Sequence, residues 1–213
     1  MSHTMTALAE TDLESGGYVN GVAVAIVCEN KDNSGQGRVK VKYSWHSDRT
    51  VSNWARVVTP MAGKGRGVYF IPEVGDEVLV AFEQGNPGSP YIVGSLWNGR
   101  AQAPENNTDG KNDRRVIHSR SGHKLVFDDG AKSLVQLELK DGKKLTIDDD
   151  RLCLDDGQGN RVDIDSKNKT VTIEAATQLN LKAPSITIDS SGGLKLKSGA
   201  TLSLEGTLIT LNN

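Results

Sequence analysis

Residues 179–213 read LNLKAPSITIDSSGGLKLKSGATLSLEGTLITLNN, and this stretch decides how the chain is interpreted. Apolar and polar residues alternate strictly within short bursts, and a glycine, serine or proline interrupts nearly every burst. Such alternation is typical of β-strands, because successive side chains point to opposite faces of a sheet. Each burst carries only two apolar side chains on one face, which is too few for a core of its own. Something outside the burst must therefore bury them.

The same pattern fills the chain from residue 137 onward. Apolar residues recur as i, i+2 pairs, and successive pairs start seven to ten residues apart. The pairs are Leu137/Leu139, Leu145/Ile147, Leu152/Leu154, Val162/Ile164, Val171/Ile173, Leu179/Leu181, Ile186/Ile188, Leu194/Leu196, Leu202/Leu204 and Ile209/Leu211, with Leu125/Phe127 as an earlier candidate. Turn signals such as Asp141-Gly142 and Ser198-Gly199 separate the pairs. The pattern predicts an octad repeat of strand and turn.

A single octad cannot fold alone. Burying its two Leu or Ile side chains gives about 3–6 kcal/mol, whereas ordering eight residues costs on the order of 12 kcal/mol. Two architectures with parallel stacking would complete it. In a single-chain β-solenoid, three consecutive octads form one triangular turn. In a trimeric prism, three identical chains each supply one side of every triangular layer. The periodicity does not separate these two.

The chain before residue 100 has a different character, because all three Trp and all four Tyr lie there. Strands are predicted at 19–30, 35–45, 52–60, 67–72, 76–83 and 90–99, separated by Gly, Asn, Asp and Pro clusters. In the second of these, one face is predicted to carry Val39, Val41, Tyr43 and Trp45, and the other Arg38, Lys40 and Lys42. About five strands in some eighty residues fit a small closed barrel, which has no exposed sheet edge. The polar, turn-rich residues 100–115 are predicted to be a linker.

Composition and motifs give little support for catalysis or a bound ion. The formal net charge is −2, and no nucleophile–base spacing or carboxylate pair stands out. GKGRG at 63–67 lacks the frame of a phosphate-binding loop, and the acidic run 148–150 fits no calcium motif. His118 and His123 have no accompanying ligand frame. We therefore expect no catalytic residue, cofactor or metal site, and we expect Cys28 and Cys153 to be free thiols in a reducing compartment.

Four segments of the first half resemble the N-terminal OB-fold domain of the spike family shared by contractile machines. They are GQGRVKVKY (35–43), WARV (54–57), PEVGDEVLVAFE (72–83) and GNP followed by PYIVGSLWNG (85–99). The family includes phage baseplate assembly protein V, the spikes of R-type pyocins and the VgrG proteins of type VI secretion. In that family the barrel precedes an intertwined, trimeric triple-stranded β-helix with an octad repeat. The resemblance thus favours the trimer over the solenoid and implies an all-β fold.

The resemblance implies four segments: an N-terminal arm (1–16), an OB-fold domain (17–99), a linker (100–115) and a triple-stranded β-helix spike (116–213). The twenty residues of the ten pairs named above, from Leu137 to Leu211, are expected to form the trimer core. No His-x-His motif of the kind that binds iron in pointed family tips is present near the C-terminus. The resemblance therefore implies a blunt end, at which Leu211, Asn212 and Asn213 are expected to dock a PAAR-repeat tip protein.

The implied function is that of a structural, non-enzymatic, homotrimeric central spike. Such a protein would be made in the bacterial cytoplasm without a signal peptide and assembled into the baseplate of a phage virion or phage-tail-like particle. Its OB domain would attach to a separate trimeric hub at the end of the tail tube, and the spike would make transient contact with the target membrane. The alternative is an OB-fold protein that binds single-stranded nucleic acid and carries a single-chain β-solenoid. The balance of eight Lys/Arg against seven Asp/Glu in residues 17–99 does not favour it.

Overall fold

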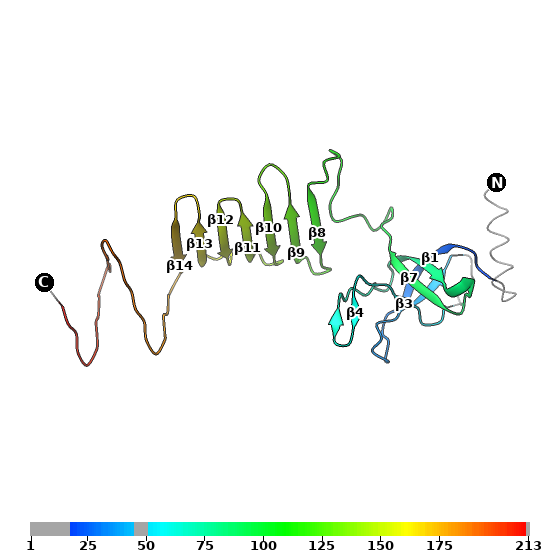
Figure 1. The fold of residues 1–213 in the computed structure, drawn as a ribbon, viewed down its shortest axis with the longest axis horizontal. Helices are drawn as coiled ribbons and strands as arrows, with labels where there is room; N and C mark the ends of the chain where they lie inside the picture. The colour runs from blue at the N-terminus through cyan, green and yellow to red at the C-terminus, as the bar shows by residue number, and fades with distance from the viewer. Residues whose placement is uncertain (1–17, 45–50, 212–213) are drawn as a thin grey trace. The chain divides into compact units, whose positions relative to one another are not determined.

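The computed structural model describes residues 18–44 and 51–211, which form two compact units. The units divide between Thr108 and Asp109, inside the predicted linker, and each is described here by itself (Figure 1). The predicted N-terminal arm, Trp45 and the expected tip-docking residues Asn212 and Asn213 lie outside the described residues.

The first unit is built on a five-stranded sheet whose order is β2-β1-β6-β7-β3. Its strands are β1 (Val22–Glu29), β2 (Lys40–Tyr43), β3 (Arg56–Val57), β6 (Glu77–Phe82) and β7 (Pro90–Ser95). All neighbours are antiparallel except β3 and β7, which are parallel. Reciprocal backbone hydrogen bonds of 2.8 and 3.0 Å join Val39 to Ala55, next to β2 and β3, and link the two ends of the sheet. This order and closure are those of an OB barrel, as predicted.

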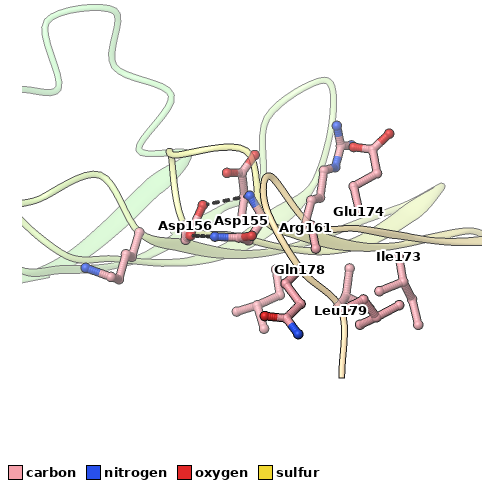
Figure 2. Close-up of a pocket in the computed structure, with 12 residues that line it drawn as sticks. Asp155, Asp156, Arg161, Ile173, Glu174, Gln178 and Leu179 are labelled. Carbon is pink, nitrogen blue, oxygen red and sulfur yellow. Dashed lines mark hydrogen bonds between the residues drawn. The ribbon is translucent and has the colours of Figure 1, made fainter. Parts of the chain in front are cut away.

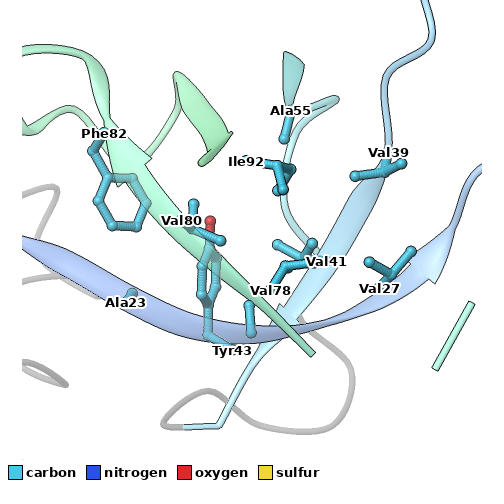
Figure 3. Close-up of a cluster of buried hydrophobic side chains, with 11 residues drawn as sticks. Ala23, Val27, Val39, Val41, Tyr43, Ala55, Val78, Val80, Phe82 and Ile92 are labelled. Atoms are coloured by element: carbon cyan, nitrogen blue, oxygen red, sulfur yellow. The ribbon is translucent and has the colours of Figure 1, made fainter. Parts of the chain in front are cut away.

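The barrel core follows from alternation along the strands. In β1, Ala23, Ala25 and Val27 point inward, while the intervening residues face outward. Fully buried aliphatic side chains from β2, β6, β7 and the residue before β2 meet them, as Figure 3 shows: Val39, Val41, Val78, Val80 and Ile92. Tyr43 packs against Phe82 with ring centroids 5.8 Å apart. The predicted inward face of residues 35–45 is therefore confirmed for its described members.

A small hairpin of β4 (Ala62–Gly63) and β5 (Arg66–Gly67) forms a separate two-stranded sheet. The predicted strand at 67–72 is wrong beyond Gly67, because Val68 makes the last backbone hydrogen bond to Met61 and no strand follows. The predicted strand at 52–60 shortens to β3. The described helical structure is a single turn, η1 (Glu83–Gly85). Within the described residues no helix has the length and apolar character needed to cross a bilayer.

The second unit contains a seven-stranded sheet in which each strand pairs with the next along the chain, as Figure 1 shows. The strands are β8 (Arg114–His118), β9 (Lys124–Asp128), β10 (Leu134–Glu138), β11 (Lys144–Asp148), β12 (Arg151–Asp155), β13 (Arg161–Asp165) and β14 (Thr170–Glu174). Every pair is antiparallel, so the expectation of parallel stacking is wrong here. The connections explain it, because turns as short as that between Asp148 and Arg151 permit only hairpins.

The octad pattern continues after β14, but the backbone pairing does not. No strand is assigned between Ala175 and Leu211, although the predicted repeat covers this segment. The segment forms extended stretches joined by bends, as Figure 1 shows. We call residues 175–211 the C-terminal segment.

Candidate assembly interface

One face of the seven-stranded sheet is apolar from β9 to β14. Directly paired residues of antiparallel strands lie on the same face, so the strand register defines two rows of side chains. One row consists of Ile117, Leu125, Leu137, Leu145, Leu154, Val162 and Ile173. The other consists of Phe127, Val135, Ile147, Leu152, Ile164 and Val171, with Arg115 at its β8 end. We call these two rows the apolar face.

The apolar face is open in the single chain. Leu154 is 54% exposed, Ile147 43% and Val171 67%, and no other part of the second unit covers them. Monomeric soluble proteins rarely leave so continuous an apolar surface in water. Fully burying each side chain would contribute roughly 1.5–3 kcal/mol. The sheet therefore presents an interface that is not satisfied within one chain.

The opposite face is polar over most of its area and carries ion pairs, although Val116, the buried Val126 and Leu134 lie on it at the β8–β10 end. Arg151 donates to the Asp163 carboxylate at 2.9 Å, and Arg161 lies 3.3 Å from the same group. Lys144 lies 3.4 Å from Glu138 on neighbouring strands. Such exposed pairs contribute little to stability but keep a surface soluble. The sheet thus has one face suited to water and one suited to burial.

The C-terminal segment has the same alternation of apolar and polar residues, but its apolar side chains are even more exposed. Its apolar side chains are between 50% and 86% exposed: Leu179, Leu181, Ile186, Ile188, Leu194, Leu196, Leu202, Leu204, Leu208, Ile209 and Leu211. Because the strand pattern persists without in-chain partners, its backbone groups and side chains both require partners from elsewhere.

A shallow pocket marks the change from paired to unpaired chain. Its apolar lining comes from Leu154, Val162, Ile173 and Leu179, together with polar residues of the adjoining turns. Figure 2 shows Ile173 and Leu179 on one side of the ribbon, with Arg161 and Glu174 on the other. The Ala176 N–H donates to the Asn160 side chain at 3.0 Å and fixes the start of the segment. The apolar side of the sheet therefore continues into the segment.

Most expected trimer-core residues with strand positions lie together. The apolar face includes Leu137, Leu145, Ile147, Leu152, Leu154, Val162, Ile164, Val171 and Ile173. Leu139 is not part of a strand, because it follows β10 and lies in a tight turn. Its N–H donates to the Lys143 carbonyl, and its own carbonyl accepts from the Gly142 N–H. The expected residues from Leu179 to Leu211 lie in the C-terminal segment.

The sequence-based pairing missed the partner of Leu137. Val135, two residues earlier, pairs with Ile147 and Phe127 on the apolar face. The sequence does contain a sign that Leu139 lies in a turn. LKDGKKL at 139–145 matches SRSGHKL at 119–125, and in this match Leu139 takes the position of Ser119. In both turns the glycine has positive φ. The Gly122 N–H donates to the Ser119 carbonyl, and the Gly142 N–H donates to the Leu139 carbonyl.

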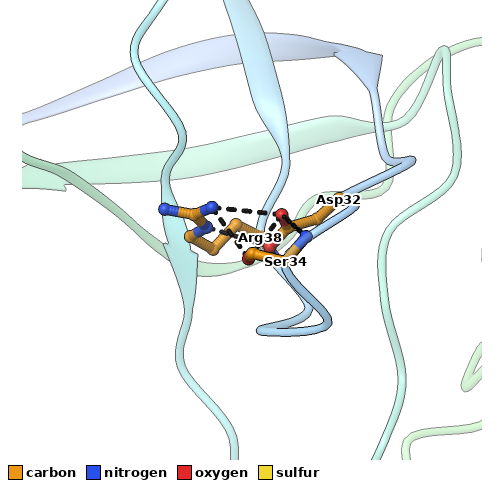
Figure 4. Close-up of polar contacts among 3 residues, drawn as sticks. All are labelled: Asp32, Ser34 and Arg38. Atoms are coloured by element: carbon orange, nitrogen blue, oxygen red, sulfur yellow. Dashed lines mark hydrogen bonds and ion pairs between the residues drawn. The ribbon is translucent and has the colours of Figure 1, made fainter.

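Two basic residues of the predicted basic face, Arg38 just before β2 and Lys40 within it, form ion pairs inside the barrel. Arg38 makes a two-pronged contact with Asp32, at 2.9 and 3.1 Å, and Figure 4 shows Ser34 bonded to both. Arg38 holds the pKa of the Asp32 carboxyl far below its usual range. Lys40 pairs with Glu29 at 2.8 Å and also stacks on Trp54. This face therefore offers little free charge to a nucleic acid.

Other motifs have structural roles. GKGRG forms the β4–β5 hairpin, and the acidic run 148–150 forms the β11–β12 turn. The His123 ring accepts a hydrogen bond from the Lys140 N–H at 3.3 Å, while His118 ends β8. Within residues 18–44 and 51–211, no group of three or more His, Cys, Asp or Glu is placed to hold a metal ion. Cys28 and Cys153 are free, and burial raises the pKa of both thiols.

Comparison with known proteins identifies the barrel. Residues 23–97 match the family model of the type VI secretion system/phage-baseplate injector OB domain. The spike protein VgrG1a of Pseudomonas aeruginosa is 40% identical over 72 residues, which cover 32% of this chain and 11% of the relative. VgrG3 of Vibrio cholerae is 36% identical over 116 residues, which cover 51% of this chain and 11% of the relative. VgrG4b of P. aeruginosa is 34% identical over 111 residues, covering 43% and 14%.

These matches cover little of the relatives' own length, since the chain spans only 11–14% of these three proteins. Their shared description is that of a type VI secretion system spike protein. The barrel topology and the family match agree on the same residues. Residues 23–97 are therefore an OB domain of the type VI secretion system/phage-baseplate injector kind, and in this part the chain is similar to VgrG spike proteins.

Proposed function

We propose that this chain is a structural, non-enzymatic, homotrimeric spike of a contractile injection machine. The observation that carries the proposal is the apolar face of the seven-stranded sheet, which is continuous from β9 to β14. Three copies that turn this face toward a common threefold axis would bury all the rows at once. Most soluble homo-oligomers have closed point-group symmetry, and a threefold axis would place the apolar face of every copy in one shared core.

The C-terminal segment supports the same assembly in a different way. Its strand-like stretches have no in-chain strand partner among the described residues. In the proposed trimer, each stretch supplies one side of a triangular layer and hydrogen-bonds to stretches of the other two chains. The predicted core residues Leu179 to Leu211 would then face the axis. A rod whose backbone is hydrogen-bonded throughout is rigid, which suits a component that is driven through an envelope.

We further propose the partners of such a spike. The OB domain would seat it on a separate hub at the end of the tube, and a PAAR-repeat protein would cap the far end near Leu211, Asn212 and Asn213. Leu208 and Leu211 are 83% and 86% exposed, which supports a contact there. Co-purification of the full chain with each candidate partner, compared with a Leu208→Asp/Leu211→Asp variant, tests the tip contact. Loss of the tip protein alone is expected.

The nucleic-acid alternative has less support. The antiparallel sheet lacks the triangular turns of the single-chain solenoid that the alternative requires. Arg38, just before β2, and Lys40 in β2 are already paired with Asp32 and Glu29. A salt-sensitive mobility shift of single-stranded DNA by the full chain would be the result that revives it.

The deciding experiment for the spike is the mass in solution, measured by light scattering. We expect three times the chain mass of 22.9 kDa, in a species that resists heat and SDS. A monomer would overturn the proposed trimer. A dimer would also overturn it, because two sheets cannot close a triangular layer.

A further inference from the structure

An unusual arm projects from the OB barrel. All residues from Pro60 to Phe70 are exposed, and the β4–β5 hairpin within them pairs with no other strand. Figure 1 shows β4 lying away from the barrel strands of the same unit. Met61 is 52% exposed, Tyr69 79% and Phe70 66%. We call residues 60–70 the arm.

The arm is built as a defined hairpin. Gly67 has a φ of +151°, and a Cβ there would lie 2.6 Å from the Met61 carbonyl oxygen, so the close backbone approach requires glycine. Gly65 has a φ of +67° at the turn, where glycine carries no steric cost. Two cations, Lys64 and Arg66, occupy the tip, and neither forms an ion pair with another described residue. The arm thus combines an aromatic base with a basic tip.

A second open surface lies on the outside of the same barrel. The outward residues of β1 are apolar, and Val22, Val24 and Ile26 are 60%, 41% and 41% exposed. On β6 the half-buried Leu79 lies opposite Val24, and Val93 on β7 is 46% exposed. We call these five residues the outer barrel face. Strands that are apolar on both faces are typical of sheets that are covered on both sides.

The charges around the outer barrel face are mixed but complement the arm on one side. Glu77 lies opposite Ile26 at one end of β6, and the exposed Glu83 follows the other end. Lys42 lies opposite Ile26 on the β2 side. Two acidic residues, Glu77 and Glu83, therefore lie at the two ends of β6 beside the outer barrel face, whereas the tip of the arm is basic.

We propose that the arm of one copy docks on the outer barrel face of the next copy, so that three OB domains form a ring. The inference rests on the proposed trimer. The two surfaces differ in shape and charge, so a twofold contact of like with like would leave their complementarity unused. A head-to-tail contact repeated around a threefold axis satisfies each surface once and closes. Because the spike would hold the three domains together, their effective concentration is high, and a modest contact suffices.

The test is photo-crosslinking in the full chain. A benzophenone amino acid replaces Tyr69, and the products are separated after complete denaturation and mapped by mass spectrometry. We expect bands of two and three linked chains, with the crosslink on the N-terminal tryptic peptide that ends at Lys31 and contains Val22, Val24 and Ile26, or next to Leu79 or Val93 on the peptide of residues 67–100. Crosslinks that stay within one chain, fall at other positions, or do not form would overturn the inference.

Matched variants sharpen this test. In the crosslinker background, Ile26→Asp is expected to lower the intermolecular crosslink at least tenfold, while Val51→Asp leaves it unchanged. Val51 is 43% exposed, close to the 41% of Ile26, and lies outside both surfaces. The double variant Lys64→Glu/Arg66→Glu is a second test that leaves the barrel strands unchanged. It is expected to lower the intermolecular crosslink severalfold. Equal crosslinking in all variants would overturn the inference.

Light scattering on the same samples separates the two proposals. A trimer without the expected crosslink overturns the arm contact and leaves the spike standing. A monomer overturns the spike and the arm contact together. A trimer with the expected crosslink supports both.

Discussion

The barrel and the repeat sheet solve the burial problem in opposite ways. The barrel buries its inward apolar side chains within one chain, and Val39, Val78 and Ile92 have no exposed surface. In the repeat unit, Val126 is the one large apolar side chain described as buried. Both regions have alternating strands. The difference is that closure of a barrel creates an inside, whereas a flat meander has two outer faces.

The difference in burial predicts how strongly the stability of each region depends on other copies of the chain. The barrel can be stable as part of a single chain, because its core and its backbone pairing are both local to residues 18–108. The repeat sheet has local backbone pairing but no covered core, and the C-terminal segment has neither. Dependence on other copies of the chain should therefore increase from the barrel to the sheet to the segment.

The largest expected effect comes from a charge on the apolar face. Ile147→Asp, in the middle strand region of the sheet, is expected to abolish the trimer, because each assembly would have to bury three unpaired carboxylates. The matched control is Thr146→Asp, on the polar face of the same strand, which should leave the trimer intact. Light scattering reads both variants. A trimeric Ile147→Asp protein would contradict the burial of this face.

The next effect distinguishes Leu137 from Leu139. Leu137→Ala removes a side chain from a row of the apolar face and is expected to cost about 2–5 kcal/mol per chain once that face is buried. Leu139→Ala acts in the turn after β10 and should cost clearly less. The temperature at which the trimer dissociates in SDS ranks the two. A larger drop in the dissociation temperature for Leu139→Ala than for Leu137→Ala would mean that Leu139 belongs to the trimer core, as the Leu137/Leu139 pairing predicts.

The sequence predicted the barrel and the repeat of short strands and turns because these depend on local alternation, turn residues and motif order. It did not predict antiparallel pairing, since a period of two is the same for either strand direction and only turn geometry decides. It misplaced Leu139 for a related reason, because a leucine in a turn continues the apolar pattern by chance. The exposed strand-like residues 68–70 show the same limit of periodicity.

A third effect should be confined to the barrel. Ile92→Ala is expected to lower the free energy of unfolding of the OB domain by about 2–5 kcal/mol, while the mass of the trimer stays unchanged. Tryptophan fluorescence in denaturant reports on this domain alone, since all three Trp precede residue 100. The control is Val74→Ala, in the same domain but 60% exposed and outside both proposed contact surfaces, which should have a small effect. Simultaneous loss of trimer and barrel would contradict their separate cooperativity.

The smallest effect concerns pH and Tyr43, whose burial in the barrel raises the pKa of its phenol to about 12. The folded-state pKa exceeds the usual value of 10.0, so burial of the neutral phenol contributes stability fully below pH 10. That contribution should disappear as the pH rises from 10 to 12, because the unfolded chain loses its proton first. Urea unfolding of the full chain, followed by tryptophan fluorescence, measures the slope. Tyr43→Phe should flatten this slope without changing the trimer, and an equal slope in both proteins would mean that other groups cause the alkaline loss.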